Sequence, residues 1–418
     1  MTMLFFVEAA MTGAGLTMLQ AVTQAGERTA FVTSKRDRYS LTAGAEVLGW
    51  LDANGRLIEV DSTDAYERPA SLSALLSGHD QEVGVIAAGD HYLPYAAHLA
   101  KDLGADFLTV EAVEILRDKR EARKLYDQLG VGNVRWSDAP DPQSVACFAS
   151  NIGGPVVIKN VRGTGSQDVV IARDESAAVR AWSSLNTINR YLRGDLMVEE
   201  YIAGPLVSCE VVVSDSQVRR LGFTDRHLSA PPVASEIGYT FPADIGNFHE
   251  NIMFAAVEEI SNALRISQGV LHSEFVLTSA EAHLIEVNAR MPGALLSHML
   301  RDCLDGDYYA LVANAALGRP TRDLAHNGKF SSGYITYAPF KARTLAASDV
   351  EAARRYPWVV DVFGGVGPTE FVGPPEDYRG AIGHVRTVAP TASLSFAAAY
   401  GAAQCLIPPL ASIRFDKV

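Results

Sequence analysis

The sequence has few cysteines, and none of them lies in a CxxC pair. Its four cysteines are scattered along the chain, at Cys147, Cys209, Cys303 and Cys405. This distribution fits a reducing compartment and argues against a zinc ribbon. We therefore expect a cytoplasmic protein.

The sequence also lacks long apolar runs and an excess of basic charge. No apolar run reaches membrane-spanning length. The segment 1–15 has neither a basic region nor a clear cleavage pattern, so it predicts a first strand and not a signal peptide. The formal net charge is −13, which does not favour a nucleic acid or an anionic membrane as a partner. Internal repeats and low-complexity tracts are absent as well.

The remaining composition is that of a globular protein. With 418 residues, of which 48% are hydrophobic, the chain is long enough for two or three domains with ample cores. Strand and helix patterns alternate over residues 1–112, which predicts an α/β layer. A turn at 12–15 resembles the start of a dinucleotide fingerprint, but Met18 occupies the third glycine position. A tight strand-to-helix turn is therefore favoured over an NAD site.

Residues 271–293 carry the most informative pattern. Two alternating segments flank the polar stretch 278–282, which predicts a β-hairpin. Glu286 and Asn288 lie two residues apart and so share a face, and normal register would place Glu274 opposite them. Mg2+ prefers such oxygen ligands. The alternative is a hairpin whose polar face is solvated, but the apolar flanks indicate burial, and buried carboxylates need a partner or a metal.

Two lysines stand out among the cations. Lys119 lies in a charged segment, 112–130, which we interpret as one long helix; most lysines on a helix surface are solvated. Lys159 ends the apolar strand 156–159, where a charged group is unexpected unless it has a function or a partner. The loop that follows is rich in small residues, and its backbone N–H groups could wrap phosphate oxygens. It lacks the Gly-Lys-Ser/Thr of a Walker loop, and an ordinary hairpin loop is the alternative.

Further polar residues follow apolar strands. Glu199 and Glu200 close the apolar part of the strand 196–202, where a carboxylate and the backbone groups of Tyr201 and Ile202 could hold an adenine ring. The segment 226–246 has no regular period and is expected to be a long, functional or mobile loop. The final hundred residues predict short strands and a last helix.

Taken in order, these motifs resemble the ATP-grasp superfamily, and within it the carboxylate–amine ligases typified by L-amino-acid ligases. The resemblance covers about residues 113–300. It implies a mixed α/β and α+β fold with three parts. These are an N-terminal α/β pre-ATP-grasp domain (1–112), an ATP-grasp domain (113–310) with a central lid subdomain (about 125–198), and a C-terminal mixed sheet (311–418).

The resemblance also implies roles for the residues that match the family's motifs. Lys119, Lys159 and a loop closing over the phosphates would bind ATP, together with the adenine-binding segment. Two Mg2+ ions, or Mn2+ in their place, would be held by the hairpin, and Arg290 would face the transferring phosphoryl group. The loop residues are Gly163, Thr164, Gly165 and Ser166; the adenine residues are Glu199, Glu200, Tyr201 and Ile202; the metal ligands are Glu274, Glu286 and Asn288.

The chain departs from the family's pattern at two places. Leu206 stands where many relatives have a ribose-binding glutamate, which puts the ribose contacts in doubt. Glu236-Ile237-Gly238-Tyr239 stands where amino-acid ligases often have E-x-G-H, so the role of that histidine cannot be transferred. Glu236, Tyr239 and Gly293 are the candidate substrate residues.

The function implied by the resemblance is ligation of a carboxylate to an amine through an acyl phosphate, with ATP as the phosphoryl donor. The expected partners are the small-molecule carboxylate and amine, and a homodimer is compatible with the family. Three alternatives stay open: a biotin-carboxylase-like enzyme, a kinase that stops at phosphorylation, and a non-catalytic nucleotide-binding protein.

Overall fold

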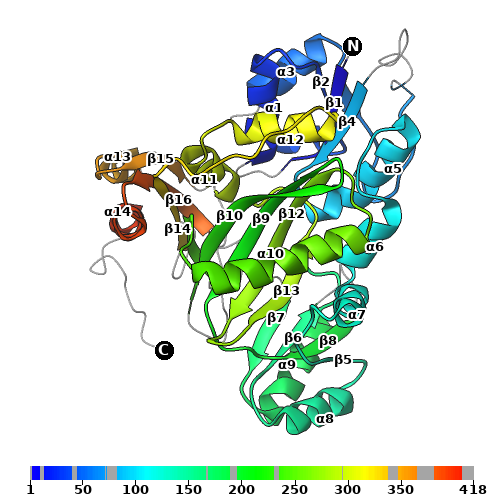
Figure 1. Ribbon diagram of the computed structural model, residues 1–418, viewed down its shortest axis with the longest axis vertical. Helices are drawn as coiled ribbons and strands as arrows, with labels where there is room; N and C mark the ends of the chain where they lie inside the picture. Colours follow the sequence, from blue (N-terminus) through cyan, green and yellow to red (C-terminus); the bar gives the residue numbers. More distant parts are fainter. Residues whose placement is uncertain are drawn as a thin grey trace. The chain divides into compact units, whose positions relative to one another are not determined.

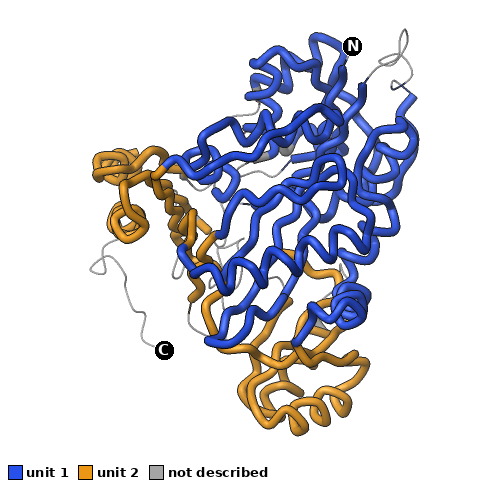
Figure 2. Tube along the Cα trace, viewed as in Figure 1, with its two compact units in different colours: residues 1–133, 207–223, 244–327 blue, residues 134–206, 224–243, 328–418 orange. Residues whose placement is uncertain are grey.

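The structure is a computed structural model, and the chain in it forms two compact units (Figures 1 and 2). Unit 1 comprises residues 1–133, 207–223 and 244–327, and unit 2 comprises residues 134–206, 224–243 and 328–418. The residues that the structure describes are 2–9, 14–39, 45–70, 72, 82–165, 168–188, 195–229, 235–293, 295–337, 347–364 and 381–406. The units are discontinuous in sequence, whereas the boundaries expected from the sequence were contiguous. Those boundaries stay a prediction.

Unit 1 opens with a parallel sheet in the order β3-β2-β1-β4. Its first strand is an unbroken apolar run that is buried from Met3 to Val7, as is typical of parallel strands covered on both faces. The predicted α/β layer is confirmed, although Thr12 and Gly13 of the 12–15 turn lie outside the described residues. The elements are β1 (Thr2–Val7), α1 (Ala14–Gln24), β2 (Thr29–Thr33), α2 (Arg36–Tyr39), α3 (Ala45–Ala53), β3 (Leu57–Glu59), β4 (Glu82–Ala87), η1 (Asp90–Tyr92), α5 (Leu93–Leu103), α6 (Val110–Arg117) and α7 (Lys119–Leu129).

The second sheet of unit 1 contains the predicted hairpin. Its strands follow the order β13-β12-β9-β10, and α10 packs on β12 and β13. The boundary between the units falls inside β10, after Phe223. The elements are β9 (Leu206–Ser214), β10 (Gln217–Leu228), α10 (Gly246–Ala263), β12 (Gly269–Leu277), β13 (Ala282–Asn288), α11 (Leu296–Cys303) and α12 (Tyr308–Ala316).

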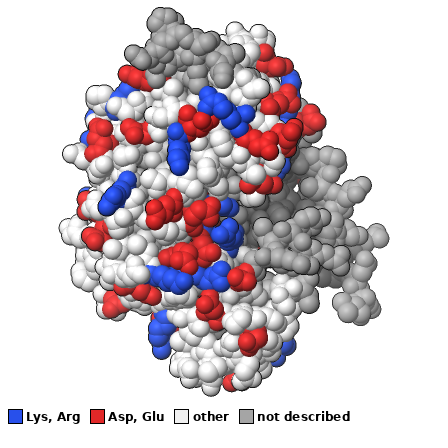
Figure 3. Space-filling view, turned by 90° about the vertical axis from the view of Figure 1, so that its right-hand side faces the viewer, with Lys and Arg blue, Asp and Glu red and all other residues white. Residues whose placement is uncertain are grey.

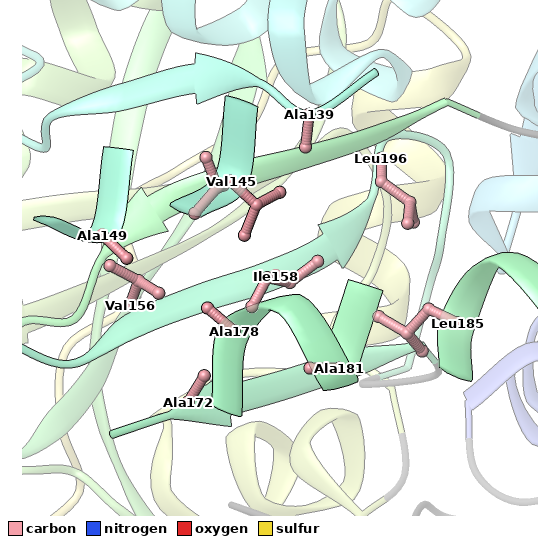
Figure 4. Packing of buried hydrophobic residues seen from close by; sticks show 11 residues of the cluster. Ala139, Val145, Ala149, Val156, Ile158, Ala172, Ala178, Ala181, Leu185 and Leu196 are labelled. Carbon is pink, nitrogen blue, oxygen red and sulfur yellow. The ribbon is translucent and has the colours of Figure 1, made fainter. Parts of the chain in front are cut away.

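Unit 2 contains a small antiparallel sheet in the order β5-β8-β6-β7, with α8 and α9 packed against it. Alternate residues of the central strands, such as Val156, Ile158 and Val198, point into an apolar core with both helices (Figure 4). Helix α8 was not predicted. The elements are β5 (Trp136–Asp138), α8 (Pro142–Ile152), β6 (Val156–Asn160), β7 (Val169–Ala172), α9 (Glu175–Ile188) and β8 (Leu196–Glu200).

The rest of unit 2 extends the end of β10 into a sheet in the order β10-β11-β14-β16-β15, with α14 packed on β14 and β16. The prediction of an irregular loop over 226–246 is wrong in two places: β10 continues to Leu228, and residues 236–241 form β11. Pairing of β11 with its two neighbours supplies the regularity that the sequence pattern lacks. The remaining elements are β11 (Glu236–Phe241), β14 (Phe330–Tyr337), α13 (Ala347–Arg354), β15 (Val359–Gly364), β16 (Ala381–Ala389), α14 (Ala392–Ala403) and η3 (Gln404–Leu406).

The charged residues give the surface a mixed character. Acidic and basic side chains are interspersed over the face shown in Figure 3. Among the helices of the described ranges, none combines the length and the apolar character that crossing a membrane requires.

The prediction of one helix over 112–130 is also wrong, because Asp118 separates α6 from α7. Asp118 has an extended backbone (φ −97°, ψ 107°), and its carboxylate accepts hydrogen bonds from the N–H groups of Arg120 and Glu121. An aspartate in this conformation is an N-cap, so it begins a new helix. Lys119 thus becomes the first residue of α7.

One prediction concerns how α7 is anchored in unit 1. Arg123 is only 1% exposed, and its guanidinium donates to the backbone carbonyls of Leu284 and Ile285 on β13. Arg123→Met would leave two buried acceptors without this donor, so we expect a loss of about 3 kcal/mol in the free energy of unfolding. Urea unfolding measures this loss. The control Lys124→Met, on the exposed side of the same helix, should change the value by no more than about 0.5 kcal/mol; equal effects would refute the anchoring role.

Candidate active site

The hairpin of β12 and β13 brings two carboxylates together in unit 1. Glu274 and Glu286 are direct register partners, as predicted, and His272 pairs with Asn288 one step further along. A β-bulge follows Glu274. Like charges placed opposite one another across a ladder destabilise the pair, so this arrangement needs compensating cations.

Lys119 is the first of these cations. Its ammonium lies 3.2 Å from Glu286 Oε1, and the residue is 9% exposed. Lys119 is therefore not solvated as most lysines on a helix surface are. Its position at the start of α7, fixed by the Asp118 cap, directs the side chain to the hairpin.

Arg290 is the second cation, and it lies beyond the strand. Arg290 follows Asn288 by two residues, a spacing that would continue the same face in a longer strand, but β13 ends at Asn288. Its Nε donates to Asp90 Oδ2 at 2.7 Å, and its Nη1 donates to Met291 O at 3.0 Å. Burial opposes the charged form, but the carboxylates of Asp90, Glu286 and Glu274 outweigh it and raise the pKa of the guanidinium. Arg290 therefore lies in the electrostatic field of both hairpin carboxylates.

Asp90 is a site residue that the sequence reasoning missed. It begins the short helix that follows β4, at the carboxyl end of a parallel strand, and this edge is where α/β sheets place ligands. The acidic residue after an apolar strand was the available signal. Gly293, a candidate substrate residue, lies close by: a Cβ added there would be 3.8 Å from Arg290 Nη1.

The donor set of the hairpin fits a hard cation that keeps other ligands. It offers two carboxylates and the amide of Asn288. Over the described part of the chain, no three or more His, Cys, Asp or Glu residues gather as a complete metal site. Mg2+ usually takes only one or two carboxylates from a protein and fills its remaining positions with water and phosphate oxygens. The residues present thus suit Mg2+ bound together with a nucleotide.

In unit 2, Lys159 and Glu199 form a buried ion pair. Lys159 Nζ lies 2.7 Å from Glu199 Oε2, and the two side chains are 6% and 4% exposed. Val157 is the register partner of Glu199, so both charged groups lie on the face of the sheet opposite the apolar core. Burying such a pair costs desolvation free energy, so the pair is weak evidence for a stabilising role and a functional role has to be considered.

The other residues expected near adenine have different surroundings. Glu200 follows Glu199 on β8 and so points to the opposite face of the sheet. Its carboxylate pairs with Arg135 at 2.6 Å. The N–H group of Tyr201 donates to Pro155 O at 3.1 Å. Ile202 follows the end of β8 and is partly exposed. These contacts leave Glu199 as the carboxylate of the pair that faces Lys159.

The small-residue loop after β6 is described only as far as Gly165. Gly163 N–H donates to Asn160 O at 3.2 Å, Thr164 is exposed, and Gly165 has φ 63°, a conformation that favours glycine. Ser166 lies outside the described residues.

The segment Glu236–Tyr239 forms a closed cluster on β11. Tyr239 is buried, and its hydroxyl donates to Glu236 Oε2 at 2.8 Å, while Arg226 makes an ion pair with the other carboxylate oxygen. A Cβ at Gly238 would be 2.7 Å from Gly333 O, so strand packing requires this glycine. Tyr239 therefore fixes the carboxylate of Glu236.

Comparisons with known proteins agree with this architecture. Residues 152–298 match the family model described as the ATP-grasp domain. The crystal structure of L-amino acid ligase from Bacillus licheniformis has a TM-score of 0.77 at 18% identity, covering 97% of this chain and 98% of that chain. Dapdiamide A synthase of Enterobacter agglomerans is 23% identical over 60% of this chain and 58% of its own length. Biotin carboxylase of Pseudomonas aeruginosa is 24% identical over 66% and 62%.

The matched stretches span less than two thirds of either of the latter two proteins, whereas the likeness to the crystal structure extends over nearly the whole fold. The domain match includes β6, β8, β12 and β13, which carry Lys159, Glu199, Glu274 and Glu286. Residues 152–298 therefore match the ATP-grasp domain, and the described chain has the ATP-grasp fold.

Proposed function

We propose that the protein is an ATP-dependent ligase that joins a carboxylate to an amine. A carboxylate oxygen attacks the γ-phosphorus, the bond from that phosphorus to the β–γ bridging oxygen breaks, and ADP leaves. The amine nitrogen then attacks the acyl carbon of the acyl phosphate, the bond to the phosphate oxygen breaks, and the nitrogen loses a proton. The products are an amide, ADP and phosphate. An amino acid or a related acid is the proposed carboxylate, which the likeness to dapdiamide A synthase and L-amino acid ligase supports.

The observation that carries this proposal is the set of charges on the hairpin of unit 1. Two opposed carboxylates, one ammonium at 3.2 Å and one half-buried guanidinium suit the handling of phosphate groups with Mg2+. Glu274, Glu286 and Asn288 would hold the metal, which neutralises phosphoryl charge when bound. Arg290 would stabilise the oxygens of the transferring group.

Unit 2 would contribute groups for the nucleotide. Lys159 would donate to phosphate oxygens, and Glu199 would accept from the adenine amino group. Lys119, in unit 1, is also proposed to bind ATP. Glu236, held by Arg226 and Tyr239, would contribute to substrate binding. The loop at 163–165 would close over the phosphates and exclude water, because hydrolysis of the acyl phosphate would waste it.

A matrix of carboxylates and amines, scored for phosphate release with mass spectrometry of the products, tests the function. The ligase requires both an acid and an amine and gives their condensed product. Dependence on bicarbonate and biotin would indicate a biotin-carboxylase-like enzyme instead. A phosphorylated acid made without regard to amine would indicate a kinase. Binding of ATP without turnover in any pair would contradict an enzymatic role.

A prediction follows for the buried pair of unit 2. Lys159→Met should weaken binding of a non-hydrolysable ATP analogue at least about tenfold, which corresponds to about 1.4 kcal/mol, because the phosphates lose a cation. Titration calorimetry measures this. Since Glu199 would be left buried and unpaired, the double variant Lys159→Met/Glu199→Gln separates the loss of affinity from the loss of stability. Arg180→Met, exposed on α9, is the control. Unchanged affinity in Lys159→Met would return Lys159 to a structural role.

A further inference from the structure

Three side chains of unit 1 form a line that begins in the core and ends at Glu274 on the hairpin. Glu210 on β9 has its Oε2 2.8 Å from His272 Nδ1. On the other side of the ring, His272 Nε2 lies 3.3 Å from Glu274 Oε1. Glu210 and His272 are 1% and 2% exposed, whereas the Glu274 side chain is 20% exposed. The line thus runs from the core to the surface of the proposed metal site.

The inner end of this line is fixed by hydrogen bonds. A carboxylate can only accept, so Nδ1 of His272 donates to Glu210. The hydroxyl of Ser208 donates to the other oxygen of Glu210 at 2.6 Å. With Nδ1 engaged and the ring buried, the orientation of His272 is determined, and Nε2 must face Glu274.

The outer end of the line, the side chain of Glu274, is not fixed in the same way. Glu274 has a flexible side chain, and its register partner Glu286 carries the same charge. Repulsion between the two carboxylates would turn Glu274 away from Glu286 unless another group holds it. His272 is placed to do so, because it is the neighbour of Glu274 on the same face of β12 and, in its imidazolium form, donates from both ring nitrogens.

We propose that Glu210 and His272 are positioning residues that hold the carboxylate of Glu274 opposite Glu286, ready for the metal. This inference rests on the proposed function, in which Glu274 is a ligand of Mg2+. Groups that orient a metal ligand from behind commonly change metal affinity 10- to 100-fold when removed, and we expect an effect of about that size here.

Two substitutions of His272 separate its two contacts. The amide nitrogen of His272→Asn can take the place of Nδ1, so this variant keeps the bond to Glu210 and loses the contact with Glu274. The longer side chain of His272→Gln can take the place of Nε2, so it keeps the contact with Glu274. His283→Asn, on β13 of the same hairpin, is the matched control because its Nε2 is near Glu281 and not Glu274.

The measurement is the binding of Mn2+ to protein that holds ADP, followed by the loss of the free-ion electron paramagnetic resonance signal. It needs no turnover. His272→Asn should raise the dissociation constant at least about tenfold, while His272→Gln and His283→Asn stay near the wild-type value. Circular dichroism on each variant restricts the comparison to folded protein. If His272→Asn binds Mn2+ as the wild type does, the proposal is overturned.

Glu274→Gln distinguishes failure of this inference from failure of the proposed function. If Glu274→Gln weakens Mn2+ binding and His272→Asn does not, Glu274 is a ligand that needs no positioning by His272. If neither variant changes the binding, the metal role of Glu274 is wrong, and both proposals lose that residue. Should His272→Asn fail to fold, His272→Gln with weakened binding would still refute the positioning by Nε2.

Discussion

Replacing Glu286 with glutamine is expected to lower ATP-dependent product formation by at least about a hundredfold, with the fold retained. The substitution keeps the shape of the side chain and removes one of the two opposed carboxylates, together with the charge 3.2 Å from Lys119. A site that holds Mg2+ between protein and phosphates depends on this charge. The side chain is 26% exposed, so the loss of its pairing should cost little stability.

Phosphate release at a series of Mg2+ concentrations measures this effect, and far-ultraviolet circular dichroism checks the fold. Glu259→Gln removes the same charge from an exposed position on α10 and serves as the control. Normal turnover of Glu286→Gln at low Mg2+ would show that the metal assignment is wrong.

Arg290→Lys is expected to reduce turnover on the order of a hundredfold, with a smaller change in ATP affinity. Lysine keeps the charge but loses the planar fork that lets arginine donate to Asp90 and Met291 O while still facing a phosphoryl group. Because charge on the phosphoryl oxygens must be held most firmly in the transition state, the effect should fall on kcat more than on nucleotide binding.

The alternative for Arg290 is a structural anchor to Asp90. Its ion pair with Asp90 at 2.7 Å gives this alternative a definite partner. Thermal unfolding and active-site titration decide between the two. If Arg290→Lys loses stability and activity together, and the fraction that remains folded is fully active, Arg290 leaves the mechanism.

The hairpin could be predicted from the sequence because its alternation has period two and its polar turn is short. Register then followed from the turn, which is why Glu274 and Glu286 were expected to face each other. Where β13 stops could not be read in the same way, since nothing in the alternation marks Asn288 as the last paired residue. The position of Arg290 beyond the end of the strand could not be predicted for that reason.

The break before Lys119 did carry a local signal that went unused. Asp118 and Glu121 have the spacing of a capping box, and the aspartate does cap α7. Other contacts had no local signal at all: Asp90 and Arg290 are 200 residues apart, and Glu210 and His272 are 62 apart. Such pairs depend on how segments that are far apart in the sequence come together in the folded unit.

The separation of Lys119 and Glu286 along the chain also determines when their contact can form during synthesis. The two residues are separated by 167 positions, and Arg123 is 161 positions ahead of Leu284. At about 5–20 residues per second, roughly 10–30 seconds pass between the emergence of α7 and that of β13. During this interval Lys119 and Arg123 on α7 cannot yet contact the hairpin, because the hairpin has not been synthesised. Unit 1 therefore completes its packing only after β13 has emerged.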